Sequence, residues 1–251
     1  MTIQYCSDLH LEFRENKQYL TDNPLTLNGE VLLLAGDIVP FAVMNKYVAF
    51  FDFLADHFET TYWIPGNHEY YHSDLADRCG SLHEKIRSNV VLVNNVAIDH
   101  KGIRFVFSTL WSHISPANQW TIQQAMADFQ VIRYKGKPFT PFDYNEQHQL
   151  CVDFLKAELE LKFKKTIVVS HHVPTFLNYP EKYKGDALNE GFAVELFNLI
   201  EPSGVDYWIY GHHHQYIPEF IIGSTMLKTN QLGYVKYKEH LSFNSKAVIE
   251  L

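Results

Sequence analysis

Short clusters of histidine and carboxylate residues, each at the end of an apolar, strand-like run, constrain this chain more than any other feature. Seven of its 14 histidines (positions 10, 68, 171, 172, 212, 213 and 214) fall in four such clusters. In chain order the clusters are Asp8-Leu9-His10, Gly66-Asn67-His68-Glu69, His171-His172 and Gly211-His212-His213-His214. A fifth break of this kind, Gly36-Asp37, follows the apolar run 31–35. Carboxylates, an amide and imidazoles are thus delivered to strand ends, and such a set can hold two divalent metal ions.

The apolar runs that precede these clusters are expected to be buried strands. They span residues 3–7, 31–35, 61–64, 166–170 and 207–210. Short, mostly apolar runs of this length are typical of strands that are covered on both faces. Parallel strands end at a common edge of their sheet, where open α/β sheets bind their ligands. Residues far apart in sequence are therefore expected to converge at that edge.

The rest of the chain predicts a layered α/β arrangement in a single domain, residues 1–251. Helices are expected at 45–58, 74–88, 122–129, 145–163 and 193–200. Strands are expected at 90–93, 96–100 and 103–108, joined by tight hairpin turns at Asn94-Asn95 and Lys101-Gly102. The segments 216–221, 224–229, 233–237 and 247–250 alternate like antiparallel strands. Residues 110–142, with a weak pattern and three prolines, are interpreted as a loop-rich insertion.

Composition limits the classes of partner and the compartment. A net charge of −8 disfavours an extended nucleic acid as partner, because that requires a broad basic face. A small phosphorylated substrate stays open, since bound metal ions would add local positive charge. Three cysteines (Cys6, Cys79 and Cys151) do not suggest a disulfide framework. With no leader-like N-terminus and no apolar run long enough for a bilayer, we expect a soluble cytoplasmic protein.

The ligand types and their spacing favour a centre of two ions. Asp8 and His10, like His212 and His214, are two residues apart, which at a strand end points both side chains to one side. Asp37 follows a glycine, which lets the backbone turn sharply and approach closely. A lone carboxylate between two sites can bridge two ions, with one oxygen to each. Oxygen and imidazole ligands without thiolate suit Mn, Fe, Zn, Co or Ni.

Two such ions suit phosphate ester chemistry. Ions about 3.5–4 Å apart can activate a bridging water and bind both the attacking and the leaving oxygen of a phosphoryl group. A leaving alkoxide needs a proton, and His68, next to the possible ligand Asn67, is placed to supply it. Taken singly, each cluster has an ordinary structural explanation as a turn or a buried histidine. To explain all five clusters without a metal site, five independent coincidences in this order would be required.

Together these motifs resemble those of the calcineurin-like metallophosphoesterases, and the resemblance runs from Asp8 to His214. The matching pieces are Asp8-x-His10, Gly36-Asp37, Gly66-Asn67-His68-Glu69, His171 and Gly211-His212-x-His214. Ser7 to Phe13, Thr109-Leu110-Trp111 and His171-His172-Val173-Pro174 are similar to small bacterial and phage members. The resemblance implies an α+β fold of four layers (α/β/β/α), in which helices flank two mixed sheets.

The resemblance also implies a role for each motif residue. One ion would be held by Asp8, His10, Asp37 and His214, and the other by Asp37, Asn67, His171 and His212. Asp37 would bridge the ions, and manganese is the favoured metal. A hydroxide between the ions would attack a phosphomono- or phosphodiester, with His68 as proton donor or transition-state stabiliser. Glu69 is expected to hydrogen-bond beside the ions rather than bind one.

Substrate choice is expected to depend on aromatic residues outside these motifs. Tyr70 follows the third motif, His113 follows Trp111, and Tyr179 and Tyr183 lie on the long loop after His171. One hypothesis is that they line the cleft and stack on a ring of the substrate, such as a nucleotide base. The alternative is that they only pack the loops against the core.

Two other functions are compatible with the same fold. A protein-interaction scaffold that has lost its chemistry, like the retromer subunit resembling this family, would lack a ligand or His68, and neither is missing here. A nuclease of the same superfamily is disfavoured because the chain has no basic track. Neither the substrate nor the oligomeric state follows from the sequence.

Overall fold

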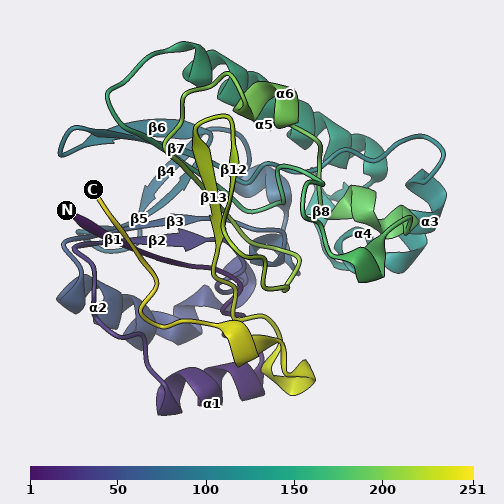
Figure 1. Cartoon of the computed structure of the whole chain (residues 1–251). Helices are drawn as coiled ribbons and strands as arrows, with labels where there is room; N and C mark the ends of the chain where they lie inside the picture. The colour runs from purple at the N-terminus through teal and green to yellow at the C-terminus, as the bar shows by residue number, and fades with distance from the viewer.

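The structure, a computed structural model, describes residues 1–251 and contains two six-stranded mixed sheets that face each other between helices (Figure 1). This is the predicted four-layer α+β fold, and the expectation is confirmed. In Figure 1, α1 (Arg14–Asp22) and α2 (Val48–His57) lie below the first sheet, and α5 (Pro141–Glu160) and α6 (Phe197–Ile200) lie above the second. None of the helices has the length and apolar character that crossing a membrane requires.

Each sheet has four parallel strands at its centre and an antiparallel strand at either edge. The first sheet runs β14 (Val248–Glu250), β1 (Thr2–Cys6), β2 (Val31–Ala35), β3 (Thr60–Ile64), β5 (Val90–Asn94) and β4 (Leu82–Lys85). The second runs β12 (Phe220–Ile222), β13 (Thr225–Thr229), β11 (Tyr207–Tyr210), β10 (Thr166–Ser170), β7 (Ile103–Ser108) and β6 (Val96–His100). All five strands that precede a polar cluster are central, parallel strands.

Strand β2 is apolar throughout because both of its faces are covered. In β2, Leu33 belongs to the core layer between the sheets that includes Phe105 and Phe107 of strand β7 in the facing sheet. Leu32 and Leu34, which alternate with it, belong to the cluster that includes Phe51 and Leu54 of α2. Successive side chains point to opposite faces, so a strand between two layers has no solvent side.

Residues 110–142 hold more regular structure than the predicted loop. They contain α3 (Gln119–Ala125), α4 (Asp128–Val131) and a small hairpin of β8 (Arg133–Tyr134) and β9 (Lys137–Pro138). The helix expected at 122–129 is divided between α3 and α4. Helix α5 begins at Pro141, before the predicted start at 145, because Thr140 and Asp143 form a capping box around a proline at the first helical position.

Several other sequence predictions are wrong. Residues 74–88 are not a helix: a single 3₁₀ turn (Leu75–Asp77) precedes β4, which pairs with β5. Asn94-Asn95 is not a hairpin, since β5 and β6 belong to different sheets, whereas Lys101-Gly102 does join β6 to β7. Residues 233–237 contain a 3₁₀ turn (Val235–Tyr237) rather than a strand. Of the helix expected at 193–200, only Phe197–Ile200 is helical, and helix α1 was not predicted.

Candidate metal centre

The loops after five central strands bring every predicted metal ligand to one edge of the two sheets. They contribute Asp8 and His10 after β1, Asp37 after β2, Asn67 after β3, His171 after β10, and His212 and His214 after β11. These residues form two groups that share Asp37. Almost all of their surface is buried, so a solvated turn does not explain them.

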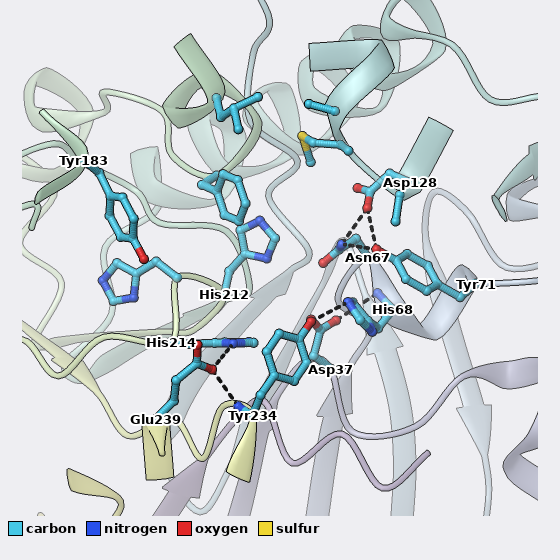
Figure 2. A pocket seen from close by; sticks show the side chains of 16 residues that line it. Asp37, Asn67, His68, Tyr71, Asp128, Tyr183, His212, His214, Tyr234 and Glu239 are labelled. Carbon is cyan, nitrogen blue, oxygen red and sulfur yellow. Dashed lines mark hydrogen bonds and ion pairs between the residues drawn. The ribbon is translucent and has the colours of Figure 1, made fainter. Parts of the chain in front are cut away.

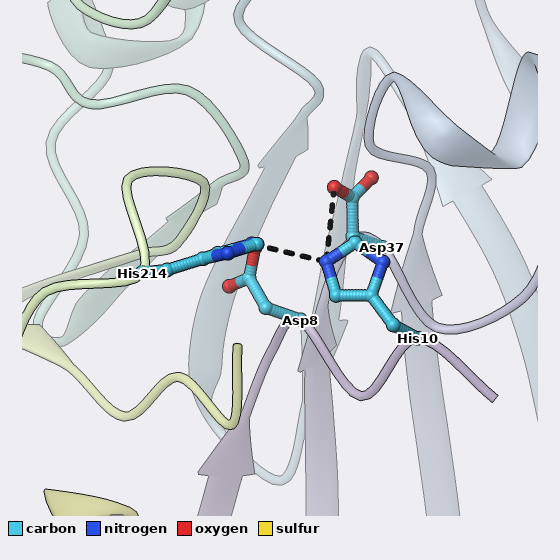
Figure 3. Close-up of side chains that lie close together, drawn as sticks. All are labelled: Asp8, His10, Asp37 and His214. Atoms are coloured by element: carbon cyan, nitrogen blue, oxygen red, sulfur yellow. Dashed lines mark hydrogen bonds and ion pairs between the residues drawn. The ribbon is translucent and has the colours of Figure 1, made fainter. Parts of the chain in front are cut away.

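The first group contains Asp8, His10, Asp37 and His214, with one possible ligand atom from each lying within 4.8 Å of the others (Figure 3). The His214 Nε2 atom is 3.2 Å from Asp8 Oδ1 and 3.0 Å from His10 Nε2. The His10 Nε2 atom is also 3.8 Å from Asp37 Oδ2. Four ligand-type atoms of this group therefore face one point.

The second group contains Asp37, His171 and His212, with Asn67 beside them. The His171 Nε2 atom is 3.4 Å from Asp37 Oδ1, 3.3 Å from Asn67 Oδ1 and 3.1 Å from His212 Nδ1. One oxygen of Asp37 thus faces the second group while the other faces His10 of the first. This is the placement that a bridging carboxylate requires.

Each histidine of the two groups has one ring nitrogen held by an acceptor from outside the cluster. His10 Nδ1 is 3.2 Å from Glu12 Oε1, and His214 Nδ1 is 2.9 Å from Glu239 Oε2. His171 Nδ1 is 2.9 Å from the Ala35 carbonyl oxygen, and His212 Nε2 is 3.3 Å from that of Gly191. An outer N–H donated in this way leaves the inner nitrogen as the one available to a metal ion.

The inner nitrogens are spaced as ligands of a common ion are. The pairs His10–His214 and His171–His212 bring ring nitrogens to 3.0 and 3.1 Å. Two nitrogens that bind one ion at about 2.1 Å and at right angles are about 3.0 Å apart. Nitrogen and oxygen ligands without sulfur fit Mn, Fe, Zn, Co or Ni, and they do not choose among these metals. The residues present therefore fit two divalent ions.

The backbone at the centre adopts conformations that non-glycine residues rarely use. Five of the seven ligand-type residues have positive φ: Asp8 (56°), His10 (46°), Asp37 (56°), His212 (82°) and His214 (49°). Left-handed residues cost free energy and persist only where the surrounding structure enforces them, a pattern that is common at functional sites. Position 66 requires a glycine for a related reason, since a Cβ atom there would collide with the Asp37 carboxylate and the His171 ring.

Glu69 holds the loops of the centre in place. Its carboxylate accepts hydrogen bonds from the backbone nitrogens of Asp37 (2.8 Å), Ile38 (2.7 Å) and Gly66 (2.6 Å). The indole nitrogen of Trp63 adds a fourth donor at 3.1 Å. Its oxygens are therefore occupied by the turns after β2 and β3, which agrees with the expectation that Glu69 does not bind an ion.

His68 lies beside both groups, with each of its ring nitrogens partnered. Its Nδ1 atom is 3.0 Å from Glu12 Oε1, and its Nε2 atom is 3.2 Å from the Tyr234 hydroxyl (Figure 2). Burial lowers the pKa of His68, but the negative charges of Asp37 and Glu12 outweigh it and the pKa is raised. The raised pKa favours the protonated, acidic form of this imidazole.

Sequence reasoning missed two carboxylates of the site. Glu12 contacts His10 and His68 through the same oxygen. Asp128 of α4 accepts hydrogen bonds from Asn67 Nδ2 at 2.9 Å and from the Tyr71 hydroxyl at 2.8 Å (Figure 2). Asp128 thereby turns the Asn67 carbonyl oxygen toward His171. The spacing Asp8-x-His10-x-Glu12 was a signal for Glu12, whereas nothing local marked Asp128.

The four residues proposed to bind substrate are placed differently from one another. Tyr70 is 1% exposed, and its hydroxyl donates to the Arg78 carbonyl oxygen, so it is part of the core. His113 is exposed and packs against His148 rather than lining the cleft beside the centre. Tyr183 does line that cleft, which has a volume of about 310 Å³, and Tyr179 lines an adjoining cavity. Tyr71, not Tyr70, faces the cleft.

Metal binding is expected to release protons. Without metal, the pKa of His171 is raised to about 9, because Asp37 outweighs the effect of burial, and that of His214 to about 10, because Asp8 and Glu239 outweigh it. Both inner nitrogens then carry protons near neutral pH, and an ion must displace them. We expect release of about two protons per protein and an apparent affinity that rises with pH up to about 10.

Calorimetric titration with Mn²⁺ in two buffers of different ionisation enthalpy measures the released protons directly. An observed enthalpy that does not depend on the buffer would contradict the expected exchange. The same titration on protein with Glu250→Gln, an exposed carboxylate remote from the centre, is the control and should give the wild-type proton release.

Comparison with known proteins adds evidence on the family and the fold. A family model for calcineurin-like phosphoesterases matches residues 1–216. An uncharacterized protein of Acanthamoeba polyphaga mimivirus is 30% identical over 284 aligned positions, covering 99% of this chain and 96% of the viral protein. The crystal structure of a phosphopantetheinyl hydrolase from Mycobacterium tuberculosis has the same fold, with a TM-score of 0.69 and 16% identity, covering 100% of this chain and 95% of that one.

Proposed function

This chain belongs to the calcineurin-like phosphoesterase family, and from that premise we propose that it hydrolyses a small phosphate ester with two divalent metal ions. The observation that carries the proposal is the convergence of four inner histidine nitrogens with the oxygens of Asp8, Asp37 and Asn67. A turn or a buried core histidine does not need such a convergence. The cleft of about 310 Å³ beside it suits a small molecule.

In this proposal the two groups hold one ion each. Asp8, His10 and His214 hold the first, Asn67, His171 and His212 hold the second, and Asp37 bridges them. When bound, the ions supply hydroxide near neutral pH and neutralise charge on the phosphoryl oxygens. Manganese is the metal to test first, since oxygen and imidazole ligands suit it.

His68 is the group that supplies the proton to the leaving oxygen. It lines the cleft, and Glu12 holds its Nδ1 atom, so its Nε2–H is directed away from Glu12. The Tyr234 hydroxyl takes that hydrogen bond at 3.2 Å in the absence of substrate. The leaving oxygen replaces this hydroxyl as acceptor, and Glu12 stabilises the imidazolium before transfer. Glu12 acts through His68 and is a positioning residue.

The proposal is tested by hydrolysis of bis-p-nitrophenyl phosphate and of p-nitrophenyl phosphate. Metal-stripped protein is expected to be inactive, and addition of Mn²⁺ is expected to restore turnover of at least one ester. Calorimetry on the same sample should show two bound ions per chain. A folded protein that binds two ions and cleaves neither ester, nor other small phosphate esters, would contradict the proposed activity and favour the scaffold.

A further inference from the structure

A second, smaller cavity adjoins the cleft on the side of the long loop after β10. Its volume is about 150 Å³, and it shares Tyr183, Leu188, Phe192 and His213 with the wall of the cleft. Tyr179 completes its aromatic lining. In Figure 2, Tyr183 and Asp128 lie on opposite sides of the cleft, with His212 between them. The smaller cavity is therefore on the Tyr183 side, away from Asn67 and Asp128.

The lining of this side cavity suits a flat, uncharged group. Four of its residues carry rings, and Leu188 adds an aliphatic surface. Asp186 and Asn189 are its polar members, and a volume of about 150 Å³ is large enough for a benzene ring. Phe192 stacks on His212 with ring centroids 4.7 Å apart, so the cavity begins directly beside the second metal group. A phosphoryl group held at the centre could thus extend one ester arm into it.

The charges around the cleft argue against a substrate with several phosphates. No lysine or arginine lines the cleft or the side cavity, whereas Asp128 and Glu239 line the first and Asp186 the second. Lys182 and Lys184, which flank Tyr183, are exposed and line neither cavity, and Lys182 lies over the Tyr183 ring. The metal ions and the His68 imidazolium are then the positive charges that face the substrate. A diester brings one negative charge and is repelled least by these carboxylates.

We propose that the side cavity binds an uncharged aromatic arm of a phosphodiester substrate while the metal centre holds its phosphoryl group. This inference rests on the proposed function for the chemistry of the phosphoryl group. It adds the substrate class, a monoanionic diester with an aromatic arm, and it assigns the recognition of that arm to Tyr179, Tyr183 and Phe192.

Calorimetry with three small ligands tests ring and charge separately on the manganese-loaded protein. Methyl phenyl phosphate and dimethyl phosphate are both monoanions that differ in the ring, and phenyl phosphate keeps the ring but is a dianion at about pH 8. Methyl phenyl phosphate is expected to bind about tenfold more tightly than dimethyl phosphate, since stacking of one ring is worth this much or more. It should also bind more tightly than phenyl phosphate.

Two variants locate the ring in the side cavity. Tyr179→Ala removes a ring that lines this cavity and not the cleft, and Leu188→Trp fills the cavity. Both variants are expected to bring the preference for the phenyl ester close to one, and Tyr179→Ala should leave dimethyl phosphate binding unchanged. Tyr216→Ala, an exposed tyrosine in another part of the surface, should keep the preference. The inference would be overturned if the wild type bound the two diesters with equal affinity or bound the dianion more tightly. It would also be overturned if the preference for the ring survived in both variants.

Hydrolysis of methyl p-nitrophenyl phosphate separates this outcome from failure of the proposed function. Metal-dependent turnover without any preference for a ring leaves the phosphoesterase activity standing and removes the side-cavity site. A preference for the ring without metal-dependent turnover of any ester supports the side-cavity site and contradicts the phosphoesterase activity.

Discussion

Replacing Asp37 with asparagine is expected to lower metal-dependent ester hydrolysis by about 10³-fold or more, because the bridging carboxylate serves both ions. Asp37 is the only residue common to both ligand groups, with Oδ1 3.4 Å from His171 Nε2 and Oδ2 3.8 Å from His10 Nε2. An amide offers one oxygen instead of two and no negative charge. Calorimetry is expected to show fewer than two ions bound by the variant.

The measurement is kcat/KM with bis-p-nitrophenyl phosphate at saturating Mn²⁺, beside the metal stoichiometry. Asp56→Asn is the matched control, because Asp56 is an exposed aspartate on α2 far from the ligand groups in the fold. Far-ultraviolet circular dichroism should show that both variants are folded. An Asp37→Asn protein with two tightly bound ions and near wild-type turnover would refute the bridging role.

His68→Gln is expected to reduce kcat by about 10²–10⁴-fold with both ions still bound, the range lost when a general acid is removed. His68 clusters with Glu12 and His10 rather than with the other ligand-type residues, and its ring nitrogens contact Glu12 and Tyr234. Metal stoichiometry therefore separates this variant from Asp37→Asn. His83→Gln, an exposed histidine on the edge strand β4, is the control.

Glu12→Gln gives a finer test of the same assignment. Burial raises the pKa of Glu12, but its hydrogen bonds to His10 and His68 lower it to about 2, so Glu12 is an anion across the neutral range. The anion raises the pKa of His68, and its removal lowers that pKa. An acid is active only below its pKa, so the alkaline limb of the kcat–pH profile should move to lower pH. A profile of His68→Gln identical to that of the wild type would remove His68 as the acid.

The sequence predicted the central strands well because their pattern has a local cause. A strand covered on both faces is mostly apolar, and the runs before Asp8, Asp37, Asn67, His171 and His212 have that character, with Gln4 and several threonine and serine residues as exceptions. The seven residues to which the resemblance assigns ligand roles follow such runs closely. Parallel strands then bring them to one edge whatever the loops between them do.

Prediction failed where the decisive contact is distant in sequence. Apolar residues at 75, 79, 82 and 86 have helical spacing, yet β4 forms because β5 supplies its hydrogen-bond partners. Asn94-Asn95 has the composition of a hairpin turn, but the chain crosses there from one sheet to the other. Local composition does not distinguish these alternatives, since the free energy that decides them comes from tertiary pairing.

The sequence by itself therefore determined the layered fold, the edge at which the polar clusters meet, and the residue types available to two metal ions. Only the tertiary structure decided which side chains support them. It placed Glu12 against His68, 56 residues away, and Asp128 against Asn67, 61 residues away. It also buried Tyr70 and opened the side cavity at Tyr179 and Tyr183. Strand patterns are local properties of the chain, whereas these contacts depend on how loops from separate layers pack together.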